Sequence, residues 1–157
     1  MDKLLKLLDT DARMSAEQLA VMLGLSKAEV EERLSTLEKA GVVRGYKALI
    51  DWDKTDREYV TAVIDLQIAP SKDRGFDAVA EAIMAFDEVE SLKLMSGGYD
   101  LSVTITGRSF RDVAMFVAKR LSPLDGVLST ATHFVLKTYK EKGVLFVDGD
   151  VDERGQI

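Results

Sequence analysis

Residues 19–46 read LAVMLGLSKAEVEERLSTLEKAGVVRGY, and this stretch predicts two helices joined by a tight turn. Gly24 supplies the turn, Ser26 opens the second helix, and Gly41 ends it before a short extended arm. Proteins present a helix to the DNA major groove by holding it steeply across a first helix, through a short turn that often contains glycine. The stretch therefore favours a DNA-binding domain.

Each of the two helices begins with a capping pattern. Ser15 is followed three residues later by Gln18, and Ser26 by Glu29. In both patterns the serine oxygen accepts a bond from the backbone amide of the third residue, whose side chain returns a bond to the serine amide. Two such patterns on either side of Gly24 predict two consecutive helix starts.

The apolar spacing of the second helix separates a core face from an outward face. The core face is predicted from Val30, Leu34 and Leu37. The candidate DNA contacts are Lys27, Ala28, Glu31 and Ser35 toward bases, and Arg33, Lys39, Arg44 and Lys47 toward phosphates. Arg33 fits a structural ion pair equally well. Ser26 is first a helix cap, although its amide end can also meet a phosphate.

The charge balance is unfavourable for a protein that binds nucleic acid. The 157 residues hold 21 Lys and Arg against 27 Asp and Glu, which gives a net charge of −6, and no region forms a basic block. Because phosphate neutralisation supplies most of the non-specific affinity for a duplex, a lone subunit should bind DNA weakly. Symmetric assembly of several subunits is expected to compensate.

Composition also argues against several kinds of site. The chain has no cysteine and one histidine, His133, which removes disulfides and thiolate chemistry and argues against a zinc site. We find no phosphate-binding loop or nucleophile elbow, no basic leader, and no apolar run long enough for a membrane. We therefore expect a cytoplasmic protein that is not an enzyme, contacts no membrane and carries no metal or cofactor. His133 is expected to be structural or at the surface.

From Tyr59 onward the hydrophobic period changes from 3.6 residues to two. Alternation predicts strands over residues 60–68, 89–96, 99–105 and 127–139, and helical spacing predicts a helix of about 13 residues from Phe76 and another over residues 110–121. This order is the split βαβ of ferredoxin-like domains. The predicted fold class is α+β, with an N-terminal winged-helix-like helix-turn-helix domain and a C-terminal βαββαβ domain.

The changes of period also predict the domain boundaries. We expect a helix-turn-helix domain with its extended arm over residues 1–50, a charged linker over 51–58, the ferredoxin-like domain over 59–143 and an acidic tail over 144–157. Trp52 in the linker is expected to be a packed anchor.

Four segments are similar to the Lrp/AsnC family of feast/famine transcriptional regulators: LLKLLDTDARMSAEQLA, LGLS, RLSTLEKAGVVRGYKALID and GGYDL. Their order and spacing agree as well, so the chain resembles this family to about Gly143. The resemblance implies a bacterial or archaeal regulator that binds double-stranded DNA as homodimers, commonly assembled into octamers. It also implies that the C-terminal domain binds a small-molecule effector, an amino acid or a related metabolite.

The implied effector site lies at the turn formed by Gly97, Gly98, Tyr99 and Asp100. Two glycines fit a tight hairpin turn, since glycine adopts positive φ without strain. They also leave bare amides for a ligand carboxylate, with Asp100 placed for an ammonium group and Tyr99 as a cover. Met95 lines the same pocket in this hypothesis and is otherwise a core residue. The sequence leaves both interpretations open.

The polar faces of the predicted strands lie opposite the helices. They carry Thr61, Asp65, Gln67, Ser102 and Thr104. We expect a partner subunit to cover this face, and the arm over residues 42–50 to pair with its symmetry mate. An effector bound between subunits would then bias one arrangement over another.

Two departures from the family pattern keep alternatives open. The outward helix face carries Glu29, Glu31 and Glu32, where the family more often has neutral or basic residues, although a glutamate can accept a bond from a cytosine amino group. The segment after Gly143 matches no family motif. One alternative is an effector-binding assembly protein whose helix-turn-helix no longer contacts DNA. Another is an enzyme similar to the sirohaem decarboxylases, for which a single histidine is a poor fit.

Overall fold

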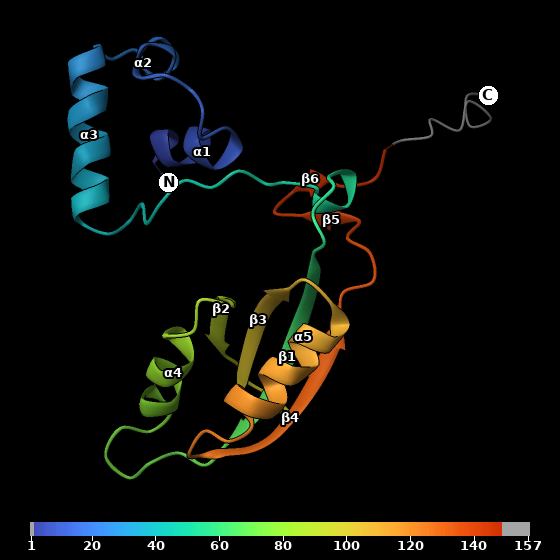
Figure 1. Cartoon of the computed structure of the whole chain (residues 1–157). Helices are drawn as coiled ribbons and strands as arrows, with labels where there is room; N and C mark the ends of the chain where they lie inside the picture. The colour runs from blue at the N-terminus through green and yellow to red at the C-terminus, as the bar shows by residue number, and fades with distance from the viewer. Residues whose placement is uncertain (1, 149–157) are drawn as a thin grey trace, which may run out of the picture. The chain divides into compact units, whose positions relative to one another are not determined.

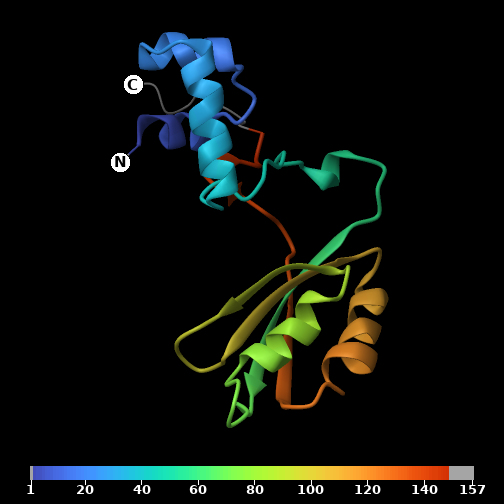
Figure 2. The same ribbon diagram turned by 90° about the vertical axis from the view of Figure 1, so that its left-hand side faces the viewer.

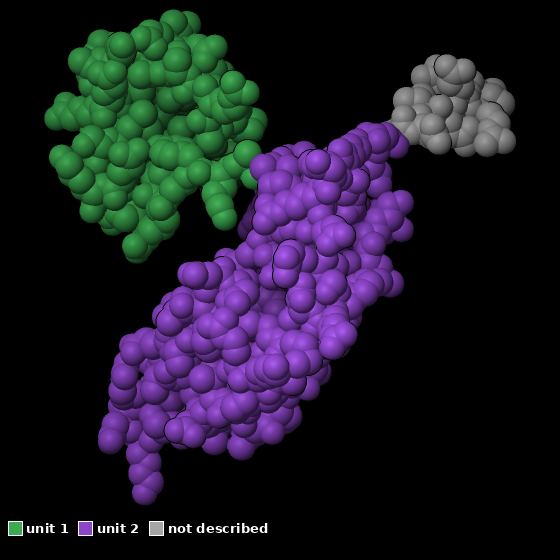
Figure 3. All heavy atoms as spheres, viewed as in Figure 1, with its two compact units in different colours: residues 1–48 green, residues 49–157 purple. Residues whose placement is uncertain are grey.

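The computed structural model describes residues 2–148, and the chain forms two compact units whose boundary falls between Ala48 and Leu49 (Figure 3). The N-terminal unit contains three helices, α1 Lys3–Thr10, α2 Ala16–Leu23 and α3 Lys27–Lys39 (Figure 1). Gly24 ends α2 with a φ of 67°, and its amide bonds back to the carbonyl oxygen of Ala20. This left-handed cap is the sharp turn that the sequence predicts at this position.

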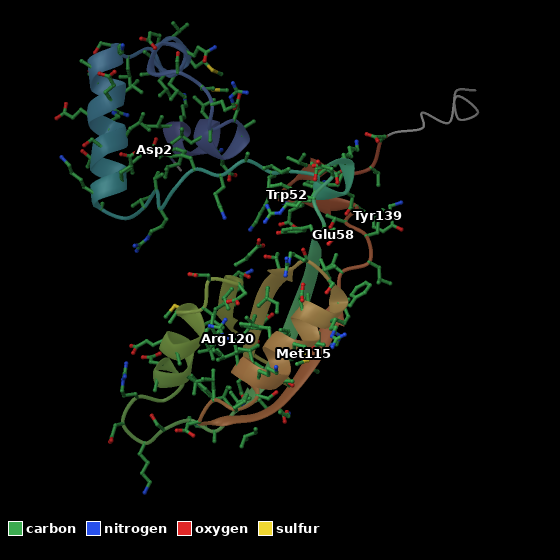
Figure 4. The ribbon with its side chains drawn as sticks, viewed as in Figure 1. Asp2, Trp52, Glu58, Met115, Arg120 and Tyr139 are labelled. Carbon is green, nitrogen blue, oxygen red and sulfur yellow. The ribbon has the colours of Figure 1, made fainter. Side chains whose placement is uncertain are left out.

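The core of the N-terminal unit is small. Its buried side chains are Leu4, Leu19, Ala20 and Val30. Leu34 and Leu37 pack against them half-buried, so the predicted core face of α3 is confirmed. The first helix is capped by Asp2, whose carboxylate accepts from the amide of Leu4 at 2.9 Å (Figure 4).

The C-terminal unit is an antiparallel sheet with two helices on one face (Figure 2). Its strands are β1 Val60–Ile68, β2 Val89–Leu94, β3 Leu101–Gly107 and β4 Val127–Phe134, in the order β2-β3-β1-β4. The helices are α4 Asp77–Met84 and α5 Phe110–Phe116, which continues into a π-helical turn, η2 Val117–Leu121. This arrangement confirms the predicted ferredoxin-like order of strands and helices.

Strand alternation places one face of the sheet in the core. Ile64 pairs with Val103 of β3 on one side and with Thr132 of β4 on the other. Ile64 and Val103 are fully buried and pack in one cluster with Ile83 of α4 and Val113 of α5. The intervening residues of β1 point to the opposite face, where no helix among the described residues of this unit covers them.

Several elements are shorter than the sequence predicts. α4 has eight residues, because a Ser71–Gly75 bridge precedes it and the amide of Phe86 bonds to the Ile83 carbonyl just beyond it. β2 ends at Leu94 and β4 ends at Phe134. β3 begins at Leu101, since the residues before it form the turn.

A hairpin follows β4 where the sequence predicts a strand end and a tail. Its strands are β5 Lys140–Glu141 and β6 Val144–Leu145. Lys142 and Gly143 between them have positive φ values of 48° and 84°, as a tight primed turn requires. Tail residues Val144 and Leu145 are therefore part of the unit. Residues 149–157 of the predicted tail lie outside the described residues.

The predicted linker is ordered against the C-terminal unit. It contains a short 3₁₀ helix, η1 Trp52–Lys54, and Lys54 forms an ion pair with Asp148 beyond β6. Trp52 stacks on Tyr59 with 5.4 Å between ring centroids, and the Arg57 guanidinium lies 4.6 Å from the Trp52 ring centre (Figure 4). Trp52 is therefore packed, as the sequence predicts.

Candidate functional site

Capping boxes fix the starts of both helices in the helix-turn-helix. The Ser26 hydroxyl accepts from the Glu29 amide at 3.2 Å, and the Ser26 amide donates to the Glu29 carboxylate at 2.8 Å. Ser15 and Gln18 form the same pair of bonds at the start of α2. The hydrogen bond from the Ser26 amide lowers the pKa of Glu29. Both predicted boxes are confirmed, and the Glu29 carboxylate accepts from the amide and the hydroxyl of Ser26.

The outward face of α3 forms a narrow stripe. At 3.6 residues per turn, Ala28, Ser35 and Lys39 lie along one side of the helix. Ala28 and Lys39 are exposed, whereas Ser35 is half-buried. Arg33 is exposed but falls outside this stripe, on the flank of the helix. Of the candidate contacts, Ala28 and Lys39 are therefore the most open on this face.

Lys27 begins α3 and is held by two carboxylates. Its ammonium lies 2.6 Å from Glu17 in the first turn of α2 and 3.7 Å from Glu31, one turn further along α3. The ion pair lowers the pKa of Glu17 to about 2 and raises the pKa of Lys27. Glu17 is not among the site residues predicted from the sequence. The capping boxes fix where each helix begins, but the contact between their first turns depends on how α2 and α3 pack.

The arm after α3 folds back on the end of the helix. The amides of Val42 and Val43 both bond to the Leu37 carbonyl, and the Tyr46 hydroxyl donates to the Glu38 carboxylate at 2.9 Å. The Arg44 guanidinium lies against Gly41, where an added Cβ would sit 3.0 Å from Cζ. Residues 42–50 form no strand in the single chain.

The cations predicted to contact phosphates are exposed. In the described part of the chain, Arg33, Lys39 and Lys47 form no ion pair within 4 Å, and neither does Arg44. Lys39 and Lys47 differ in this respect from Lys27. Among the described residues of the N-terminal unit, unpaired, exposed cations therefore lie at the end of α3 and in the arm.

The glycine turn between β2 and β3 is tied to the end of β1. The Asp100 amide donates to the Leu66 carbonyl, and its carboxylate oxygen Oδ2 accepts from the Ile68 amide, both at 2.8 Å. The Gln67 side chain donates to the Gly98 carbonyl at 3.2 Å. Gly97 has a φ of 112°, which favours glycine. The Asp100 carboxylate is therefore a structural acceptor with one oxygen already bonded.

The remaining turn residues are accessible. An added Cβ at Gly97 or Gly98 would meet no atom within 4 Å. Tyr99 is half-buried. Met95, whose amide bonds to the Asp100 carbonyl, is 38% exposed, so it is a surface residue of the single chain and not a core methionine. The structure thus places the five predicted effector residues around one open turn.

Apart from Val63, the uncovered face of the sheet carries small and polar side chains at the paired positions of β1 and β4. His133 Nε2 lies 3.0 Å from Asp65 Oδ2, and the Ser129 hydroxyl donates to the Gln67 side chain at 3.0 Å. No local sequence pattern predicts a partner for His133, because Asp65 is 68 residues away and reaches it only through the β1–β4 register. Across the described residues, no group of three or more His, Cys, Asp and Glu could hold a metal ion, and no helix is long and apolar enough to cross a membrane.

Comparison with known domains identifies both units. Residues 61–145 match the Lrp/AsnC ligand-binding domain, and residues 3–44 match the winged helix-turn-helix DNA-binding domain. The chain belongs to the Lrp/AsnC family of transcriptional regulators. This Lrp/AsnC regulator therefore joins a DNA-binding unit to an effector-binding unit, as the sequence predicts.

The family relationship extends over nearly the whole chain. The protein is 50% identical over 153 residues to the HTH-type transcriptional regulator YugG of Bacillus subtilis, which covers 97% of this chain and 92% of YugG. It is 26% identical to the proline dehydrogenase transcriptional activator of Rhizobium radiobacter, over 90% of each chain. A Neisseria meningitidis transcriptional regulator in complex with L-Met has a TM-score of 0.73 at 28% identity, covering 90% of this chain and 93% of that one.

Proposed function

We propose that this Lrp/AsnC regulator acts as a homo-oligomer that places α3 in the DNA major groove and binds an amino acid at the turn of residues 97–100. The observation that carries the proposal is the pair of capping boxes, which fixes where α3 begins. The first residues of a recognition helix contact base edges. Lys27 and Ala28 occupy these positions and are exposed.

The proposed DNA contacts divide between bases and phosphates. Lys27, Ala28, Glu31 and Ser35 would face bases, and Arg33, Lys39, Arg44 and Lys47 would approach phosphates. Each subunit brings few cations, so affinity would come from several helices on one DNA molecule. A dimer would read a pseudo-palindrome with half-sites about one or two helical turns apart.

The proposed effector is an amino acid, bound through bare turn amides and oriented acidic and aromatic groups. The open faces of Gly97 and Gly98 support binding of a carboxylate, and the Ile68 amide holds the Asp100 carboxylate in a fixed orientation. The Neisseria relative was solved with L-Met. Because Met95 and the glycines are exposed in the single chain, we propose that a second copy completes the site.

The proposed assembly begins with a homodimer and continues to an octamer. The sheet face with the Asp65–His133 pair has no helix over it in the part of its unit that the structure describes. Apolar arm residues Val42, Tyr46 and Leu49 are 44–55% exposed, which also favours cover by a second chain. A partner copy could therefore pack against the apolar arm and against the polar sheet face.

One alternative function has an observation in its favour. The pairing of Lys27 with Glu17 and Glu31 removes a cation from the recognition helix, as expected of an assembly protein that does not contact DNA.

Capture of genomic DNA fragments at low salt, repeated with a panel of amino acids, tests the proposal. We expect enrichment of a small set of fragments that changes with at least one amino acid. Equal recovery of all fragments, or none, in every condition would contradict DNA reading. Enrichment that no amino acid changes would contradict only the effector assignment.

A further inference from the structure

The contact between Glu17 and Lys27 joins the two helices of the DNA-binding motif. Glu17 lies in the first turn of α2, and Lys27 is the first residue of α3. Their charged atoms are 2.6 Å apart, and both side chains remain more than half exposed. The pair therefore sits at the surface, at the end of α3 that a recognition helix turns toward bases.

We propose that Glu17 is a positioning residue for DNA specificity, because it holds the Lys27 ammonium and cancels its attraction to phosphates. This inference rests on the proposed function of α3. A free lysine at this end of the helix would attract any duplex and add about one unit to the salt dependence of binding. A lysine paired with Glu17 loses most of that indiscriminate attraction.

The same pair leaves a route to sequence discrimination. Guanine presents two acceptors, O6 and N7, in the major groove, and a lysine ammonium can bond to both. At a DNA site with guanine in the right place, Lys27 would exchange its ion pair with Glu17 for bonds to the base. At a site without guanine there, Lys27 would stay paired with Glu17, whose carboxylate also repels phosphates. Glu17 would therefore lower binding to wrong sites more than binding to right ones.

A purely structural role for the pair is a weaker explanation. The starts of α2 and α3 are already fixed by the Ser15–Gln18 and Ser26–Glu29 boxes, which do not involve Glu17 or Lys27. Surface ion pairs contribute little to stability. Leu19 and Val30, both buried, hold the two helices together in the core. The pair can thus be removed while the fold is kept.

The test compares Glu17→Gln with Glu32→Gln on a random-sequence duplex of about 30 base pairs, long enough for two half-sites one turn apart. Glu32 is a matched control, because it is exposed on α3 and forms no ion pair among residues 2–148. Full-length protein is titrated at several salt concentrations, and Glu17→Asp is included as the conservative variant. The double variant Glu17→Gln/Lys27→Gln shows whether any gain passes through Lys27.

We expect Glu17→Gln to tighten non-specific binding roughly three- to five-fold at low salt and to steepen the salt slope by about 0.9. Glu17→Asp should restore wild-type behaviour, and the double variant should lose the gain. Equal effects of Glu17→Gln and Glu32→Gln, or a gain that survives loss of Lys27, would overturn the masking role while leaving DNA binding intact. Absence of binding by every protein would overturn both the masking role and the proposed function.

Discussion

The two units of this regulator are stabilised in different ways. Within the described residues, the N-terminal unit buries four side chains, whereas the core of the C-terminal unit buries thirteen. The first is defined by local contacts over three or four residues, such as the boxes at Ser15 and Ser26. The second depends on strand pairings between distant segments. The DNA-binding unit thus depends on local contacts and has a small core, whereas the effector unit depends on long-range strand pairing and has a larger core.

Loss of one core side chain should separate the units most clearly. Leu19→Ala removes a buried leucine from a core of four and should cost about 2–5 kcal/mol, enough to unfold the N-terminal unit alone. NMR spectra should then keep the dispersed strand signals of residues 60–134 and lose those of α1–α3. Ile83→Ala, in the larger core, is the matched change and should leave α1–α3 folded. Simultaneous loss of both units in either variant would contradict their independence.

The two turn glycines provide a sharper test within the effector unit. Gly97→Ala places a side chain at a φ of 112° and should lower the free energy of unfolding by about 1–2 kcal/mol. Gly98→Ala meets no atom within 4 Å and should leave stability almost unchanged. Urea unfolding measures both, and calorimetry with L-methionine as the probe measures binding. If Gly98 offers its amide to a ligand, Gly98→Ala should bind more weakly while remaining stable. If Gly98→Ala is stable and binds as tightly as the wild type, the turn of residues 97–100 has only a structural role.

Removal of a helix cap should destabilise the DNA-binding unit modestly. Ser26→Ala removes the hydroxyl that accepts from the Glu29 amide and should cost about 1 kcal/mol of stability in the N-terminal unit. Ser15→Ala should cost about the same, since it has the same box. Of the two, only Ser26→Ala frays the end of α3 and should also weaken DNA binding. If both variants are equally stable and bind DNA equally well, the start of α3 does not contact the bases.

A single exposed cation should have a smaller effect, visible in the salt dependence. Lys39→Gln should reduce the slope of log affinity against log salt by about 0.9 if Lys39 contacts a phosphate. Lys142→Gln, on the β5–β6 turn of the other unit, removes the same charge and should leave the slope unchanged. Identical slopes for the two variants would exclude Lys39 as a phosphate contact.

The smallest expected effect is on acid titration. Glu17 has a folded-state pKa of about 2, below the ordinary 4.5, so its contribution to stability is full above pH 4.5 and is lost as the pH falls toward 2. DNA binding should therefore show no Glu17-dependent change between pH 5 and pH 8. A carbon NMR titration of the carboxyl group measures this pKa, which Lys27→Gln should raise toward 4.5. An unchanged midpoint in that variant would contradict the ion pair.

Local patterns in the sequence were sufficient for the helix-turn-helix and for the order of strands. The Ser15 and Ser26 boxes, the core position of Val30 and the alternation along β1 depend on neighbours within a few residues, so periodicity finds them. The Asp65–His133 pair and the Asp100–Ile68 bond join separate strands, and no local period reports them. For the same reason Asp100 is predicted from the sequence only as a group for a ligand ammonium, although one of its oxygens accepts from the Ile68 amide at the end of β1.

Short-range rules also fail where a segment changes direction. The β5–β6 hairpin turns at Lys142 and Gly143, and lysine rarely adopts positive φ. The sequence therefore predicts the end of the domain at Gly143 and not a hairpin. The link between Glu17 and Lys27 spans ten residues and requires the turn at Gly24 to be in place. Contacts of this kind become visible only once the elements are assembled.

In the proposed mechanism, a sparsely charged subunit binds DNA through symmetric assembly. The variant Thr104→Tyr tests this mechanism. Thr104 lies on the uncovered sheet face, where it pairs with Val63. Tyrosine is a bulky, neutral residue that favours strands, so it should block packing of a second copy without changing the charge. Mass and DNA affinity are measured on the same samples at physiological salt. We predict a folded protein of lower mass that no longer holds the operator held by the wild type. A monomer that binds that operator as tightly as the wild type would contradict this mechanism.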